Sequence, residues 1–280
     1  MLCSSFQLAP GLRRRSEQRL WQHSVLRWQD YDPSARLLTK RADALLRPAL
    51  ERARAAFEAR DADGLAQLLP AEEHWRLFSE FAGDAAYLDI ETSDDTVGAG
   101  FISAIGVLDR SGPRLLLAGP ALHSFPELAR GWSVLVTFNG SSFDLPILRR
   151  VFPDWQPPRA HIDLRHVLRR LGYSGGLKAI ERRVPLLHLA RPGHLDGLGA
   201  GQACGLYALG RNGDRAALRR FAEYNLYDVI NLRTLMAFAY NALVEAHAAR
   251  VPGLRDGAPP VAIPGRGDVL YDVSKILLSL

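Results

Sequence analysis

Residues 85–92 read Ala-Ala-Tyr-Leu-Asp-Ile-Glu-Thr, an apolar run that carries two acids. Such a run predicts a buried strand over residues 85–90. Side chains two residues apart in a strand point to the same face, so Asp89 and Glu91 can reach one site. A solvated edge strand would also tolerate two acids, but the apolar neighbours disfavour that alternative. Because burying an unpaired charge is costly, we interpret the two acids as ligands of a cation.

Two further acids lie in comparable contexts later in the chain. Residues 139–146 read Asn-Gly-Ser-Ser-Phe-Asp-Leu-Pro, a tight turn that places Asp144 near the start of a helix. Residues 224–229 read Tyr-Asn-Leu-Tyr-Asp-Val within a long helical pattern, so Tyr224 and Asp228 share one face. Taken alone, the first acid fits a helix N-terminus, where the helix dipole favours it, and the second fits a surface helix. Hard divalent cations prefer oxygen ligands, so together the acids predict one metal site, formed by Asp89, Glu91, Asp144 and Asp228.

The order of the predicted elements indicates an α/β fold. Three consecutive strands, then alternating strands and helices, imply a mixed sheet flanked by helices, with three antiparallel strands followed by parallel ones. Before the sheet, residues 1–80 have a helical pattern, with one helix predicted over residues 36–69 and opened at Pro33. After it, residues 251–280 predict a loop-like tail that ends in a last apolar segment. The predicted strands are 85–90, 100–108, 114–118, 132–138 and 161–164, and the predicted helices are 143–152, one ending at 171, 177–183 and 216–249.

The composition is ordinary for a globular protein. Of 280 residues, 48% are hydrophobic and 23% charged, and no apolar run is long enough to cross a bilayer. Residues 1–10 are too short and too weakly apolar for a secretory signal, and the two cysteines, Cys3 and Cys204, lie far apart, so we expect a cytoplasmic protein. The net charge is +5, with arginine-rich stretches at residues 1–60 and 149–191. Such basic stretches fit a nucleic-acid partner or a solvated surface, and charge alone does not decide between them.

The acidic segments, in this order, resemble the motifs of the DEDD superfamily of 3′-5′ exonucleases, in its tyrosine-bearing branch. Within that superfamily, residues 83–245 are most similar to the YprB-like ribonuclease-H-like domains of bacteria. The chain departs from the family pattern in a short connection at residues 119–131 and in the glycine-rich residues 195–199. Neither departure removes a carboxylate. The resemblance is carried by residues 89–92, 139–146, 161–164, 177–182 and 224–229.

The resemblance implies a ribonuclease-H-like exonuclease domain over residues 81–250, between a helical N-terminal extension (1–80) and a C-terminal tail (251–280). The substrate would be single-stranded or frayed DNA or RNA, cut from the 3′ end to release 5′-phosphate nucleotides. The alternative is a nucleic-acid-binding module with the same fold and weak or absent catalysis. Loss of a metal ligand would mark that alternative, and all four carboxylates are present. The choice between DNA and RNA and the oligomeric state stay open.

The resemblance also assigns roles to the acids. It implies two divalent cations, Mg²⁺ or Mn²⁺, because the ligands are carboxylate oxygens. Asp89 would bridge the two ions. Glu91 and Asp228 would hold the ion that activates water, and Asp144 would support the other ion. Tyr224 would align the attacking water.

Four further residues are candidates for substrate contact: Thr92, Asn139, Phe143 and Lys178. Asn139 could equally satisfy the backbone of its own turn, an alternative that we favour slightly. Phe143 could stack on a base, but a phenylalanine is more often a core residue, and we favour packing in the core. Lys178 could lie on a solvated helix face instead of binding a phosphate.

Overall fold

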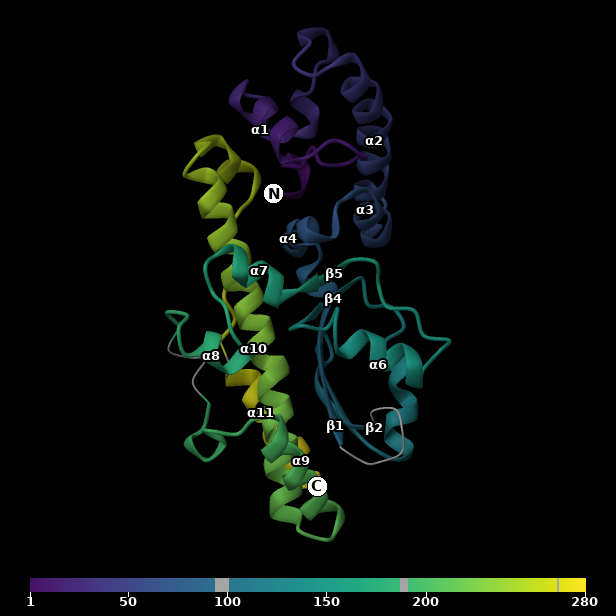
Figure 1. Ribbon diagram of the computed structural model, residues 1–280, viewed down its shortest axis with the longest axis vertical. Helices are drawn as coiled ribbons and strands as arrows, with labels where there is room; N and C mark the ends of the chain where they lie inside the picture. The colour runs from purple at the N-terminus through teal and green to yellow at the C-terminus, as the bar shows by residue number, and fades with distance from the viewer. Residues whose placement is uncertain (94–100, 187–190, 266) are drawn as a thin grey trace.

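The computed structural model of the chain describes residues 1–93, 101–186, 191–265 and 267–280. Five strands form one sheet in the order β3-β2-β1-β4-β5. Figure 1 labels β1, β2, β4 and β5 of this sheet. β2 is antiparallel to β1 and β3, and β4 is parallel to β1 and β5. This arrangement confirms the predicted mixed sheet, although residue 100, the predicted start of the second strand, lies outside the described residues. The strands are β1 (Ala85–Ser93), β2 (Phe101–Asp109), β3 (Gly112–Leu117), β4 (Val134–Thr137) and β5 (His161–Asp163).

The side chains of β1 alternate between two faces of the sheet, as the sequence predicts. Leu88 and Ile90 belong to a hydrophobic cluster that also contains residues of helices α5 (Phe125–Leu128) and α6 (Asp144–Val151). Tyr87 belongs to a second cluster, which contains residues of the long helix α10. Because the side-chain period of a strand is two residues, the acids that follow Tyr87 point toward α10.

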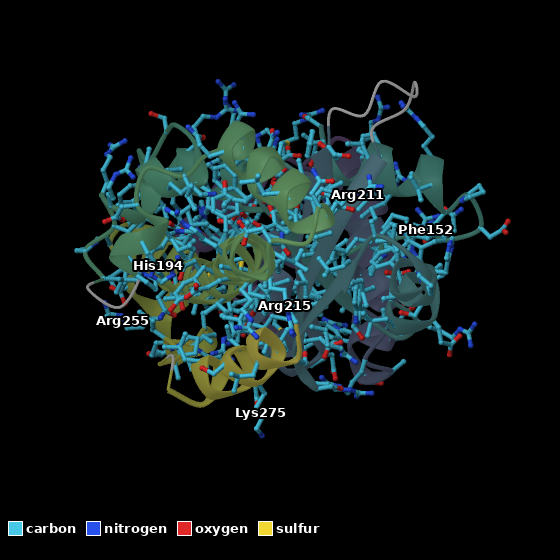
Figure 2. All side chains as sticks on the ribbon, turned by 90° about the horizontal axis from the view of Figure 1, so that it is seen from below. Phe152, His194, Arg211, Arg215, Arg255 and Lys275 are labelled. Carbon is cyan, nitrogen blue, oxygen red and sulfur yellow. The ribbon has the colours of Figure 1, made fainter. Side chains whose placement is uncertain are left out.

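Helix α10 (Arg215–Ala248) lies against the sheet, in contact with β1, β2, β3 and β4. The side chain of Asp214 caps its first turn by accepting hydrogen bonds from two backbone N–H groups, those of Ala216 and Ala217. Near this end, Arg215, labelled in Figure 2, donates a hydrogen bond to the carbonyl of Leu280 at 3.0 Å. The last apolar segment is therefore a docked helix, α11 (Gly267–Ser279), which packs against β3 and α10.

In the described part of the chain between β5 and α10, three α-helices follow the sheet. They are α7 (Leu164–Arg170), α8 (Leu177–Glu181) and α9 (Ala200–Arg211). Helix α9 was not predicted from the sequence, because its three glycines lower helix propensity. Ala203 and Tyr207 bury one side of α9 in a cluster with α10 residues, and this packing stabilises the helix despite its glycines.

The helical region before the sheet differs in detail from the prediction. The predicted single helix over residues 36–69 is wrong. Residues 33–35 form a short 3-10 turn, and Arg36 and Arg60 have left-handed backbone (φ 52° each), which interrupts the helical pattern. Thr39 and Asp61 then cap new helices with their side chains. The helices of this region are α1 (Arg14–Gln22), α2 (Lys40–Glu58), α3 (Ala62–Leu68) and α4 (Phe78–Phe81).

One hydrophobic cluster joins the two regions. It extends from Phe6 and Trp21 through Trp75 to Val136 of β4 and Tyr240 of α10. The division of the chain at residues 80 and 250 stays a prediction. Among the described residues, no helix is long and apolar enough to cross a membrane.

Candidate metal centre and its surroundings

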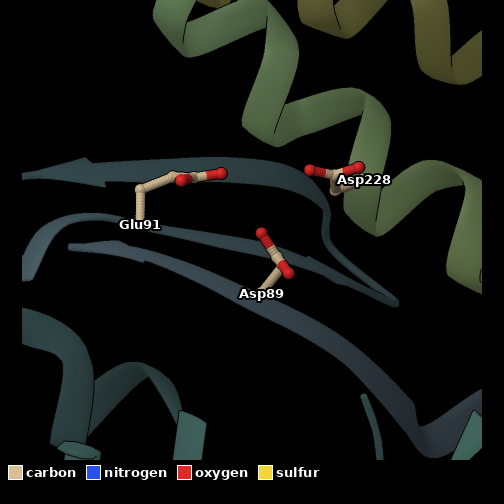
Figure 3. A group of neighbouring side chains, drawn as sticks. All are labelled: Asp89, Glu91 and Asp228. Carbon is tan, nitrogen blue, oxygen red and sulfur yellow. The ribbon is translucent and has the colours of Figure 1, made fainter. Parts of the chain in front are cut away.

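Three of the predicted acids meet between β1 and α10. Oxygens of Asp89, Glu91 and Asp228 all lie within 4.8 Å of one another. Figure 3 shows the two β1 side chains and the α10 side chain pointing into the same space. Glu91 and Asp228 are buried, and Asp89 is partly buried. The i,i+2 spacing on the strand and the position of Asp228 on the covering helix produce this convergence.

The fourth acid, Asp144, lies at the edge of this group. It is the first residue of α6, and its Oδ1 accepts a hydrogen bond from the backbone N–H of Ile90 at 3.1 Å. Asp144 is 2% exposed. This bond ties the start of α6 to the middle of β1, directly between the two acids of the strand.

Crowding and burial oppose ionisation of these acids. Burial, followed by the charges of Asp228, Glu91 and Asp144, raises the pKa of Asp89 well above its ordinary value. Burial and the charge of Asp228 raise the pKa of Glu91 to about 8. Burial is also the main cause that raises the pKa of Asp144 to about 7. A divalent cation would relieve this repulsion, and the all-carboxylate donor set fits a hard ion such as Mg²⁺ or Mn²⁺.

Two cationic side chains also contact Asp228. Lys178 of α8 donates to both carboxylate oxygens of Asp228, at 3.0 Å each. Arg191 donates to Asp228 and, at 2.8 and 2.6 Å, to the two oxygens of Glu181. Glu181 in turn accepts a hydrogen bond from Asn231 at 2.8 Å. Lys178 was predicted from the sequence as a substrate contact, whereas Arg191, Glu181 and Asn231 were missed.

Tyr224 lies beside the same carboxylate, one helical turn before it. Its ring is packed under Lys178, whose Nζ is 4.1 Å from the ring centroid. Burial, followed by the charge of Asp228, raises the pKa of the phenol to about 12. The hydroxyl is therefore protonated at neutral pH and can donate a hydrogen bond.

Asn225, which was not singled out from the sequence, holds Asp89 from the other side. Its Nδ2 donates to Asp89 Oδ2 at 2.9 Å, and the residue is fully buried. Asn225 reaches Asp89 across β2 at Gly106, which pairs with Asp89 in the sheet. A Cβ at this glycine would lie 2.2 Å from Asn225 Oδ1. An isolated glycine inside an apolar strand pattern is the sequence signal for such a close approach.

We therefore expect Gly106→Ala to weaken metal binding by displacing Asn225 from Asp89. Loss of a group that orients a ligand lowers metal affinity roughly 10- to 100-fold. Calorimetric titration with Mn²⁺ measures the effect. Gly83→Ala is the matched control, because a Cβ at Gly83 meets no atom within 4 Å. An unchanged Mn²⁺ affinity in Gly106→Ala would contradict a positioning role for Asn225.

The turn before Asp144 is organised by Asp163. This carboxylate accepts hydrogen bonds from the backbone N–H groups of Asn139, Ser141 and Arg165, at 2.8, 3.1 and 3.1 Å. Asn139 has left-handed backbone (φ 65°), and its side-chain oxygen accepts from Arg165. These bonds hold the geometry of the turn, so Asn139 has a structural role here, and its contact with substrate stays a prediction.

The two remaining candidates for substrate contact are neighbours of the acids along the chain. Phe143 precedes Asp144, and Thr92 follows Glu91. Phe143 is 41% exposed, so the alternative that it packs in the core is wrong. Thr92 is partly buried, and its carbonyl accepts a hydrogen bond from the thiol of Cys204 at 3.0 Å. For both residues, contact with substrate stays a prediction.

The mixed sheet and its covering helices make this an α/β protein. Its acidic site consists of carboxylates on the central strand and on the helix that covers it, and such a site could hold a metal ion. Residues 86–240 match the family model of the RNase_H superfamily, and the chain belongs to that superfamily. This membership confirms the ribonuclease-H-like fold that the motifs predicted.

A solved structure is also similar to the chain. It is the crystal structure of the EXO domain of Nibbler from Aedes aegypti, with 13% sequence identity and a TM-score of 0.34. The likeness covers 65% of this chain and 90% of that one, and it is too low to indicate function. No curated protein matches the chain.

Proposed function

We propose that this protein is a metal-dependent 3′-5′ exonuclease that hydrolyses phosphodiester bonds at the end of single-stranded or frayed DNA or RNA. The observation that carries the proposal is the convergence of Asp89, Glu91 and Asp228 within 4.8 Å. Membership of the RNase_H superfamily supports a nuclease. The order of the three acidic segments, with Tyr224 four residues before Asp228, supports the tyrosine-bearing exonuclease branch.

The four carboxylates would hold two divalent cations, Mg²⁺ or Mn²⁺. Such ions activate a water molecule and neutralise charge on the phosphate. Asp89 would serve both ions. Glu91 and Asp228 would hold the ion that activates water, and Asp144 would support the other.

The chain's own residues would position the reactants. Tyr224 keeps its proton at neutral pH because its pKa is raised to about 12. It can therefore orient the attacking water by a hydrogen bond without removing a proton from it. Asn225 fixes one oxygen of Asp89 at 2.9 Å, and the Ile90 N–H fixes one oxygen of Asp144 at 3.1 Å. These bonds reduce the reorganisation required when substrate binds.

A nucleic-acid-binding module with the same fold is the second candidate. It would need basic surface, which the arginine-rich stretches supply, and it would not need a converged set of buried acids. Burial, together with neighbouring charges, raises the pKa values of Asp89, Glu91 and Asp144, and such an arrangement of acids is unfavourable in a protein that only binds. We therefore favour the enzyme.

The test is an assay on an oligonucleotide that carries a label at its 5′ end. We expect a ladder of stepwise shorter products in Mn²⁺, 5′-phosphate mononucleotides as the released product, and no shortening in EDTA. A strand with a blocked 3′ end is the control and should survive. Internal fragments from the blocked strand would point to an endonuclease instead. Binding without shortening, on DNA and on RNA, would favour the binding module.

A further inference from the structure

A cavity of about 920 Å³ is lined in part by Lys178 and Arg191, the two cations that contact Asp228. Its volume lies within the range that small-ligand pockets have in proteins. We call it the α8–α9 pocket, because its lining residues belong to α8, to the described residues between α8 and α9, and to the start of α9. Its lining residues include Lys178, Glu181, Arg182, Leu186, Arg191 and Leu198.

The lining of the α8–α9 pocket combines charged and apolar groups. Lys178, Arg182 and Arg191 contribute positive charge, and Leu186 and Leu198 contribute apolar surface. The lining acids are Asp196 and Glu181, and Glu181 is paired with Arg191. Cationic and apolar groups in one lining suit a ligand that has a phosphate at one end and a flat, weakly polar ring at the other. A nucleotide has this chemistry.

The pocket and the acidic cluster share the two cations that contact Asp228. These cations are held very differently. Arg191 is 7% exposed and is fixed by both oxygens of Glu181, which Asn231 holds in turn. Lys178 contacts Asp228 and both the ring and the hydroxyl of Tyr224, and its side chain is 26% exposed. Lys178 can therefore leave Asp228 by rotating its flexible stem, whereas Arg191 is anchored.

Lys178 and a metal ion would compete for Asp228. Lys178 donates to both carboxylate oxygens at 3.0 Å and Arg191 donates to Oδ1, so three of the carboxylate's roughly four lone-pair sites are taken. A divalent ion on the same carboxylate would also repel the ammonium group, so binding of the ion favours release of Lys178. A lysine released at the edge of a pocket that also holds Arg191 leaves two positive charges facing the cavity. Phosphate oxygens would pair with both charges.

We propose that the α8–α9 pocket is a nucleotide subsite and that Lys178 is its exchangeable ligand, which neutralises Asp228 in the metal-free chain and binds substrate phosphate when Asp228 holds a cation. The inference rests on the proposed nuclease function and deepens it. It predicts that one substitution at Lys178 raises the affinity for Mn²⁺ and lowers the affinity for nucleotide, whereas replacing a purely structural lysine would not change the two affinities in opposite directions.

The first experiment uses Lys178→Met in the full chain and two calorimetric titrations. Without nucleotide, the Kd for Mn²⁺ is expected to fall roughly tenfold. A competing group lowers the apparent affinity of a site in proportion to the fraction of molecules in which the site is free, and the substitution removes the competing ammonium group. In saturating Mg²⁺, the Kd for thymidine 5′-monophosphate is expected to rise roughly tenfold, because a charge-assisted hydrogen bond is lost. Arg169→Met, an equal change of charge on an exposed part of α7, is the control and should change neither value.

The second experiment tests the location of the subsite. Leu198→Trp narrows the α8–α9 pocket without removing a charge, and it should weaken nucleotide binding while leaving the Mn²⁺ affinity unchanged. Leu209→Trp is the matched control, because Leu209 lies on α9 and is 53% exposed. Circular dichroism on each variant shows whether it folds.

The outcomes separate this inference from the proposed function. If the wild type takes up no Mn²⁺ and shortens no strand, the proposed function and the subsite both fail. If the wild type is active but Lys178→Met binds Mn²⁺ no more tightly, or nucleotide no more weakly, then the subsite alone is wrong. The same holds if Leu198→Trp binds nucleotide like the wild type.

Discussion

Asp89→Asn is expected to abolish strand shortening and, in the same protein, to stabilise the metal-free chain. A neutral amide cannot replace a carboxylate that two cations would share with Glu91 and Asp228. We expect a loss of at least roughly a thousandfold in kcat/KM, about 4 kcal/mol of transition-state stabilisation. The labelled-strand assay in Mn²⁺ measures this loss.

The gain in stability follows from the pKa values of the cluster. Burial and mutual repulsion raise the pKa of Glu91 from 4.5 to about 8 and that of Asp144 from 3.8 to about 7. An acid whose pKa is raised by folding binds more protons in the folded state than in the unfolded state. The stability of the metal-free chain should therefore fall as pH rises from about 4 to about 8. Removing the charge of Asp89 relieves this repulsion.

Urea unfolding in EDTA at pH 5 and pH 8 tests the second half of the prediction. The wild type should be less stable at pH 8 than at pH 5, and Asp89→Asn should show a smaller difference. In thermal unfolding at pH 8, each 1 kcal/mol of relieved repulsion should raise Tm by about 2–4 °C. Asp154→Asn, at an exposed acid, is the control. An inactive variant that is also less stable would indicate a structural role for Asp89 instead of a metal site.

The sheet and the acidic cluster could be predicted because local periodicity determines them. The alternation of β1 places Asp89 and Glu91 on one face, and the long helix α10 packs against the sheet on that face. The four-residue spacing of Tyr224 and Asp228 likewise fixes their common side of α10. In these cases short-range geometry decides which side chains can meet.

The parts that could not be predicted depend on contacts between distant segments. Arg191 reaches Asp228 and Glu181 from a glycine- and proline-containing connection that has no periodicity. Phe143 is apolar, which favours the core, but it follows a turn whose geometry turns it outward. Gly106 of β2 indicates that another group approaches the strand closely, but it does not identify that group. Its partner, Asn225, lies 119 residues further along the chain (225 minus 106).

Arg76 joins the N-terminal helices to the rest of the molecule, and this role too could not be predicted from the sequence. It is 1% exposed, and its guanidinium donates to Glu17 at 2.7 and 3.1 Å and to Glu73 at 2.6 Å. Glu17 is fully buried and also accepts the backbone N–H of Phe6 at 2.9 Å. Trp21 and Trp75 pack their rings near the same guanidinium, at 5.7 and 5.4 Å. The cation thus neutralises Glu17 and shares Glu73 with Arg170, which pairs with Glu73 at 3.2 Å.

Arg76→Met is therefore expected to destabilise the protein strongly. Removing one partner of a buried ion pair leaves the other charge uncompensated and is destabilising by about 3–5 kcal/mol. At about 2–4 °C per kcal/mol, the fall in Tm should be on the order of 10 °C. Thermal unfolding followed by circular dichroism measures it. Arg41→Met, an equal change at an exposed position on α2, should stay within about 0.5 kcal/mol of the wild type.

A triple variant, Arg76→Met with Glu17→Gln and Glu73→Gln, distinguishes two causes of the lost stability. One is the burial of acids without a counter-ion, and the other is the loss of the guanidinium's own contacts. If uncompensated burial of the acids causes the loss, neutralising both should recover part of the stability. If instead the loss comes from the packing of the guanidinium between Trp21 and Trp75, the triple variant should be no more stable than Arg76→Met. If the stability of Arg76→Met alone lies within about 1 kcal/mol of that of the wild type, water or movement of the N-terminal segment compensates the acids. Breaking an ion pair from which water is excluded would cost more than that.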